Sequence, residues 1–287
     1  MENAIEITSL SKNYPGFHLD NITFSLPRGS IMGFIGENGA GKTTTIKAVL
    51  GLIKKDAGTV RLLGSTTPDD RTVKEKIGVV FDECCIPDGF TVKEAEKIFS
   101  RIYRTWDAPL FAEYLRKFSL PADKKVREFS RGMKMKLSIA VALAHRPELL
   151  ILDEATSGLD PVVREEILDI FLDFIQDENH AILLSSHITS DLDKIADYIT
   201  FIHAGKIVFS APRDVVLTQM GIWKCGADDA AMLDAKSAGL LRMRKNQFGC
   251  EVLIENRERF CSQYPEAVVD PATTESVMLF YVRGEEI

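Results

Sequence analysis

The chain has 287 residues, of which 45% are hydrophobic and 27% charged, so it can bury one large core or two smaller ones. It has no run of about 18 apolar residues, which argues against a membrane-spanning helix, and its first residues do not resemble a secretion signal. The net charge of −7 argues against a nucleic-acid partner. Five cysteines without C-x-x-C spacing predict free thiols in a reducing cytosol.

The first part of the chain predicts a small antiparallel sheet. Between residues 4 and 27, apolar residues alternate with polar ones in short runs. The sequence Asn13-Tyr14-Pro15-Gly16 between these runs is typical of a turn. The ring of Tyr14 could stack on a nucleotide base or pack on its own sheet, and the sequence leaves both interpretations open.

A glycine-rich loop follows the apolar run at residues 31–35 and leads into a predicted helix at 44–50. Glycines let successive backbone N–H groups point into one concavity at the positive end of a helix. In such a loop a lysine reaches the terminal phosphates and a hydroxyl can bind Mg²⁺. The predicted nucleotide-binding residues are Gly36, Glu37, Asn38, Gly39, Ala40, Gly41, Lys42, Thr43 and Thr44. We therefore expect the chain to bind a nucleoside triphosphate.

Strands and helices alternate through the rest of the first 215 residues. Buried strands are predicted at 77–81, 149–152 and 181–185, and a glycine-turn hairpin at 199–209. Residues 91–145 show the period of amphipathic helices. This order predicts an α/β doubly wound core with a helical insertion. Residues 216–287 predict short strands and a final helix over 274–281.

Three side chains follow buried strands, where parallel sheets present their functional groups. Asp153 is placed to hold Mg²⁺ together with Thr43, and Glu154 is placed to act as general base at the γ-phosphate. His187 follows the next predicted strand and is expected to contact the same phosphate. These residues predict triphosphate hydrolysis.

Five motifs in this order resemble those of the ATP-binding subunit of an ABC transporter over about residues 4–215. They are residues 36–43, Phe129-Ser130-Arg131-Gly132-Met133, Leu149 to Glu154, Ser157-Gly158-Leu159-Asp160, and Ser186-His187. The resemblance implies an α/β P-loop NTPase core with a mixed, mostly parallel sheet. It also implies an N-terminal antiparallel β-subdomain, an inserted helical subdomain at about 83–145 and an accessory extension at 216–287.

The resemblance further implies two ATP-binding subunits, a homodimer or heterodimer, that close head to tail on ATP and Mg²⁺. Ser130 and Gly132 would contact the nucleotide of the opposite subunit, since a helix N-terminus binds anions. Asp160 would couple the two sites, and Tyr14 would stack on adenine. An integral membrane permease would dock on the helical insertion, and the subunit would lie in the cytoplasm on the inner face of the cell membrane.

The sequence departs from the family pattern in two places. Where the family usually has Leu-Ser-Gly-Gly-Gln, this chain has Phe129-Ser130-Arg131-Gly132-Met133. Asp82 stands where the family has a glutamine that ligates Mg²⁺, with Glu83 as the alternative ligand. The variants resemble the branch that serves ABC-2-type exporters. We expect a transport ATPase, with a soluble ATPase acting on ribosomes or DNA, or an ATP-binding regulator, as the alternatives.

Overall fold

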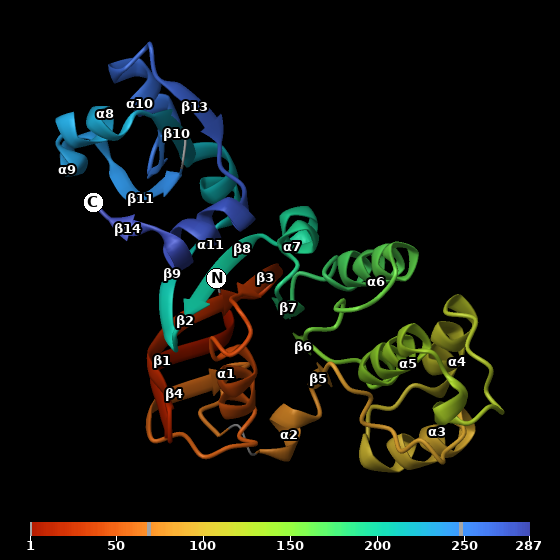
Figure 1. Ribbon diagram of the computed structural model, residues 1–287. Helices are drawn as coiled ribbons and strands as arrows, with labels where there is room; N and C mark the ends of the chain where they lie inside the picture. Colours follow the sequence, from red (N-terminus) through yellow and green to blue (C-terminus); the bar gives the residue numbers. More distant parts are fainter. Residues whose placement is uncertain (1, 68–69, 247–248) are drawn as a thin grey trace.

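The computed structural model describes residues 2–67, 70–246 and 249–287, and Figure 1 shows its arrangement. A six-stranded sheet has the order β5-β6-β7-β3-β8-β9, with all pairs parallel except β8 and β9. Its strands are β3 (Ser30–Ile35), β5 (Ile77–Val80), β6 (Leu149–Asp153), β7 (Ala181–Ser186), β8 (Tyr198–His203) and β9 (Lys206–Pro212). The helices directly around it are α1 (Lys42–Val49), α2 (Arg71–Lys74), α5 (Arg131–Ala144), α6 (Pro161–Phe174) and α7 (Thr189–Ile195).

Both faces of this sheet are covered, which explains its continuous apolar strands. Leu149 and Ile151 point to the face shared with α1 and a small second sheet. Leu150 and Leu152 point to the opposite face, which packs against α5 and α6. Successive side chains of a strand alternate between faces, so one apolar run supplies two cores.

The small second sheet is antiparallel, in the order β2-β1-β4, as predicted for the N-terminal segment. Its strands are β1 (Asn3–Tyr14), β2 (Phe17–Pro27) and β4 (Ala57–Leu62). The rings of Phe24 and Phe34 meet 5.5 Å apart between the two sheets. The mixed, mostly parallel sheet and this antiparallel sheet confirm the predicted fold class.

The predicted helical insertion lies beside the β5 end of the main sheet (Figure 1). It contains α3 (Val92–Ile102), α4 (Ala108–Lys117), the 3₁₀ turn η1 (Val126–Glu128) and α5 (Arg131–Ala144). Reciprocal bonds between Thr91 and Glu94 form a capping box at the start of α3. Because Asp107 caps α4 and Ser130 caps α5, each helix begins where a side-chain acceptor is available.

The C-terminal residues form a separate five-stranded antiparallel sheet, in the order β13-β10-β12-β11-β14, at the opposite end of the molecule from the helical insertion (Figure 1). The elements of this C-terminal region are the helical turn η2 (Val215–Gln219), β10 (Gly221–Cys225), α8 (Ala227–Met232), α9 (Ala235–Ala238), β11 (Leu240–Asn246), β12 (Gly249–Ile254), α10 (Arg257–Gln263), β13 (Val268–Pro271), α11 (Thr274–Arg283) and β14 (Glu285–Glu286). The predicted strands and final helix of this region are confirmed, while the domain limits at 215 and 216 stay a prediction. All five cysteines are free thiols, and no helix among the described residues is long and apolar enough to cross a membrane.

Candidate functional site

The glycine-rich loop connects β3 to α1, which is the predicted strand–loop–helix arrangement. Gly39 and Gly41 have φ of 84° and 115°, a region that favours glycine. A Cβ at Gly36 would lie 2.4 Å from the carbonyl oxygen of Ile202, so only glycine fits beside β8. The loop and Glu154 line a pocket of about 380 Å³. Its volume and its backbone N–H groups suit a phosphate chain.

Lys42 lies inside this loop and is 5% exposed. Its Nζ donates to the carbonyl oxygens of Gly36 and Glu37, at 2.7 and 3.3 Å. The same Nζ lies 3.3 Å from the Glu154 carboxylate. The two carbonyl oxygens and the Glu154 carboxylate therefore hold the Lys42 amino group at the loop, next to the position that phosphates would take.

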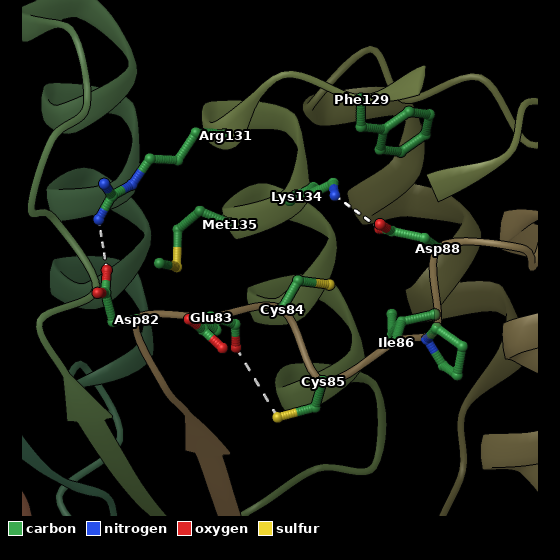
Figure 2. A pocket seen from close by; sticks show the side chains of 11 residues that line it. Asp82, Glu83, Cys84, Cys85, Ile86, Asp88, Phe129, Arg131, Lys134 and Met135 are labelled. Carbon is green, nitrogen blue, oxygen red and sulfur yellow. Dashed lines mark hydrogen bonds and ion pairs between the residues drawn. The ribbon is translucent and has the colours of Figure 1, made fainter. Parts of the chain in front are cut away.

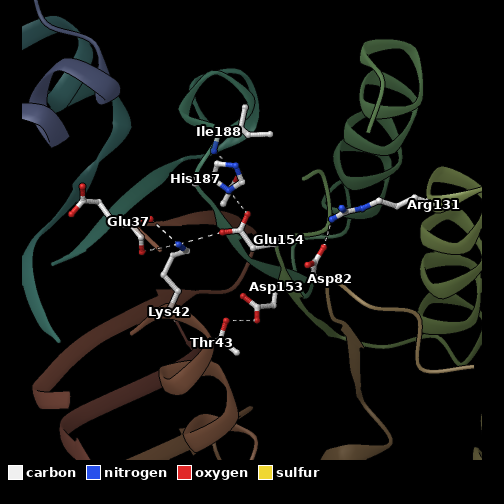
Figure 3. A network of polar contacts seen from close by, with 11 residues as sticks. Glu37, Lys42, Thr43, Asp82, Arg131, Asp153, Glu154, His187 and Ile188 are labelled. Atoms are coloured by element: carbon white, nitrogen blue, oxygen red, sulfur yellow. Dashed lines mark hydrogen bonds and ion pairs between the residues drawn. The ribbon is translucent and has the colours of Figure 1, made fainter. Parts of the chain in front are cut away.

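Asp153 is the last residue of β6, and its side chain diverges from that of Glu154, the next residue, as predicted (Figure 3). The Asp153 carboxylate accepts from the Thr43 hydroxyl at 2.8 Å. Its other oxygen, Oδ1, is buried and has no hydrogen-bond partner among the described residues. A buried carboxylate oxygen next to a threonine hydroxyl is a donor set that Mg²⁺ prefers, so these residues fit that ion.

Glu154 adopts φ of 56°, in the left-handed region that is uncommon for residues with a side chain. This turn directs its carboxylate away from Asp153 and toward Lys42 and His187. His187 Nδ1 lies 2.6 Å from Glu154 Oε2 (Figure 3). Backbone strain of this kind costs on the order of 1–3 kcal/mol and is often retained at functional sites. The structure thus brings Lys42, Thr43, Asp153, Glu154 and His187 together.

Ser130, Gly132 and Asp160 lie on a neighbouring surface, where the starts of α5 and α6 meet. Ser130 caps α5 by accepting from the Met133 N–H at 3.2 Å, and Asp160 caps α6 by accepting from the Val163 N–H at 3.1 Å. A Cβ at Gly132 would lie 3.5 Å from Val163, so the two helix starts are in contact. Ser130 and Asp160 are exposed. None of the three lines the phosphate pocket of their own chain, and their predicted contact with a second subunit stays a prediction.

Asp82 is paired with the guanidinium of Arg131 in the structure (Figure 3). No contact among the described residues joins Asp82 to Thr43 or Asp153, so its role as a metal ligand stays a prediction. Glu83, the alternative ligand, lines a different groove. The same guanidinium packs on Gly158, where an added Cβ would lie 2.9 Å from Arg131 Nη1. Arg131 therefore connects two predicted motifs.

That groove lies between the segment after β5 and helix α5 and has a volume of about 690 Å³ (Figure 2). Its lining residues are Asp82, Glu83, Cys84, Cys85, Ile86, Pro87, Asp88, Phe129, Arg131, Lys134 and Met135. Lys134 pairs with Asp88 at 2.7 Å across one wall. Burial raises the pKa of the Cys85 thiol, with Cys84 and Glu83 adding to the effect, so this thiol stays protonated near neutral pH. The groove is lined by both charged and apolar side chains.

The aromatic side chain at the phosphate pocket is Phe17, which the sequence analysis missed. Its ring reaches the loop, because a Cβ at Gly41 would lie 3.0 Å from Phe17 Cζ. Tyr14 pairs with Phe17 in the register of β1 and β2, but it is 42% exposed and has the Lys12 amino group 5.3 Å from its ring centre. The two-residue turn at Pro15 and Gly16 was the signal for this aromatic pair. The predicted stacking of Tyr14 on adenine stays a prediction.

The chain is similar in sequence to a known family and to known proteins. The family model described as ABC transporter matches residues 19–157. The bacitracin transport ATP-binding protein BcrA of Bacillus licheniformis is 36% identical over 218 residues, which cover 75% of this chain and 71% of that protein. The Nod factor export ATP-binding protein I of Burkholderia orbicola (strain AU 1054) is 35% identical over 247 residues, covering 82% of this chain and 80% of that protein.

Solved structures give the same result. An ATP-binding subunit of an ABC transporter superposes with a TM-score of 0.69 at 28% identity, covering 74% of this chain and 91% of that chain. A dimeric post-hydrolysis ATP-binding cassette bound to ADP and Pi superposes with a TM-score of 0.65 at 21% identity, covering 72% of this chain and 98% of that chain, and this likeness shows the fold. The predicted family is confirmed: the chain belongs to the ABC transporter family, as an ATP-binding subunit whose ATPase activity energises transport.

Proposed function

We propose that this chain drives export across the cell membrane from the cytoplasmic face, as one of two ATP-binding subunits bound to a membrane permease. ATP closes the two subunits, and hydrolysis opens them. The name of the bacitracin relative supports a role in transport, and the name of the Nod factor relative supports export. The observation that carries the ATPase part is the Glu154 carboxylate, which contacts both Lys42 and His187 beside the phosphate loop.

In this proposal Glu154 takes the proton of the attacking water and His187 positions the γ-phosphate. Lys42 leaves the loop carbonyls for the phosphates, which are stronger acceptors because they are charged. Thr43 and Asp153 would hold Mg²⁺, and the free Oδ1 of Asp153 supports this. Bound there, the ion would neutralise phosphate charge. Asp82 is proposed as a further ligand only after its separation from Arg131.

The groove beside α5 is proposed as the docking site of the permease. It lies in the helical insertion, and its lining combines apolar side chains with the charged pair Asp88 and Lys134. Ser130, Gly132 and Asp160 are proposed to contact the second subunit, because Ser130 and Asp160 are exposed at two adjoining helix starts. Residues 216–287 are proposed as an accessory domain.

The test is affinity purification of the tagged chain from detergent-solubilised membranes of its own host, followed by mass spectrometry. A polytopic membrane protein in near-equal amount is the expected result. The variant Cys85→Arg, which fills the groove, should lose this protein, while the control Ser100→Arg on the exposed side of α3 should keep it. Ribosomal or DNA-repair proteins as the main partners would overturn the transport role and leave the ATPase chemistry standing.

A further inference from the structure

Helix α7 (Thr189–Ile195) begins two residues after His187 and ties this histidine to the rest of the molecule. The Ile188 N–H donates to the Ser186 hydroxyl at 2.9 Å, so the segment between β7 and α7 is tightly held. Only a few rotatable bonds separate the imidazole from α7. Any shift of α7 therefore changes where His187 lies relative to Glu154.

One side of α7 contacts α6, the helix that starts directly after Asp160. Asp191, which is 1% exposed, lies 3.6 Å from the Arg164 guanidinium. Lys194 forms an ion pair with Glu165. These contacts join α7 to the predicted subunit interface.

The other side of α7 contacts α11 (Thr274–Arg283), which belongs to the C-terminal extension (Figure 1). Thr274 is fully buried, and its hydroxyl donates to the Asp193 carboxylate. The Arg213 guanidinium donates to the Asp193 carbonyl oxygen at 3.3 Å. The first residue of α11 is thus hydrogen-bonded to the helix that carries His187.

Helix α11 packs against both the C-terminal extension and the ATP-binding part of the chain. Val277 and Phe280 are buried in the core of the C-terminal extension. The Tyr281 ring packs against the ATP-binding part, with its centre 6.1 Å from Phe201 on β8 and 5.8 Å from Phe209 on β9. A helix packed in this way transmits a displacement of the extension to α7 rather than absorbing it.

We propose that Thr274 and Asp193 are positioning residues for ATP hydrolysis, through which the C-terminal extension sets the placement of His187 at Glu154. The proposal rests on the role proposed above for His187. Loss of the Thr274–Asp193 bond frees α7 from one of its anchors, and His187 then spends less time in hydrogen-bond contact with Glu154. Among the described residues, none from α11 lines the phosphate pocket, so we expect nucleotide binding to be unaffected.

The test uses Thr274→Val in the full chain, because valine keeps the shape of threonine and removes only the hydroxyl. We expect kcat for ATP hydrolysis to fall roughly two- to thirtyfold, with KM for ATP unchanged. In a His187→Ala background, single-turnover rates should show no further loss from Thr274→Val. Thr273→Val is the matched control, because the Thr273 hydroxyl caps α11 by accepting from the Ser276 N–H. Within the part of the chain that the structure describes, no hydrogen bond joins this hydroxyl to α7.

An equal loss of kcat in both valine variants would mean that only the stability of α11 matters, and the proposal would be overturned. The proposal would also be overturned if Thr274→Val lowered the hydrolysis rate by the same factor in the His187→Ala background as in the wild type. It would be overturned as well if His187→Ala lowered kcat while Thr274→Val left kcat unchanged. If instead His187→Ala alone hydrolyses ATP at the wild-type rate, the proposed role of His187 is wrong, and the Thr274 bond has no catalytic target. The two failures are therefore distinguishable.

Discussion

Replacing Glu154 by glutamine is the sharpest perturbation of the proposed chemistry. The amide keeps the size and the hydrogen-bonding capacity of the side chain, but it cannot accept the proton of the attacking water. Lys42 stays held by the carbonyls of Gly36 and Glu37, so the loop should keep its shape. Because a negative charge 3.3 Å from Lys42 is lost, the loop should bind ATP at least as tightly as before.

Losing a general base typically costs 10²–10⁴ in rate, which is roughly 2.7–5.4 kcal/mol of barrier at 1.36 kcal/mol for each factor of ten. We expect Glu154→Gln to reduce single-turnover ATP hydrolysis by about this factor, while its Kd for ATP, measured by calorimetry, stays within a few-fold. The control is Glu113→Gln on the exposed side of α4, which removes the same charge far from the loop. Hydrolysis at the wild-type rate by Glu154→Gln would refute the assignment of the base.

Three further variants separate binding, metal use and stability. Lys42→Ala removes a charge-assisted contact and should weaken ATP binding roughly 10- to 100-fold by calorimetry; unchanged affinity would contradict the loop assignment. Asp153→Asn should reduce the gain in ATP affinity that Mg²⁺ provides, measured by titrations with and without the metal, and an unchanged gain would count against Asp153 as a ligand. Burial lowers the pKa of His145 below 6.5, so the unfolded chain binds this proton more tightly and the folded state loses stability as pH falls from 6.5 toward the folded-state pKa. In thermal melts, His145→Gln should therefore show a smaller fall in Tm from neutral to mildly acidic pH than the wild type, and an equal fall would contradict the argument.

The sequence predicted those parts of the site whose geometry is local. A strand, a glycine-rich loop and a helix in succession leave few ways to place Lys42 and Thr43. The C-terminal ends of parallel strands lie at one edge of a sheet, so Asp153 and His187 had to be neighbours of the loop once the strands paired. The register of β3, β6 and β7 then brought the carboxylate of Asp153 within hydrogen-bond distance of Thr43.

The remaining features depend on contacts between distant segments. The turn at Pro15 and Gly16 sets the pairing of Tyr14 with Phe17 in the β1–β2 hairpin. Which of the two rings reaches the phosphate loop depends on how the hairpin packs on that distant loop, and it is Phe17.

The pairing of Asp82 with Arg131 likewise follows from how α5 lies against the end of β5. The bond from Thr274 to Asp193 needs the extension to fold and then to pack on α7. No local pattern marks either partner of that bond, since a threonine at a helix start is usually only a cap. A contact between segments far apart in the sequence is found only once their packing is known, and this is why the Thr274–Asp193 bond, and not the phosphate loop, is the place where the structure adds most to the sequence.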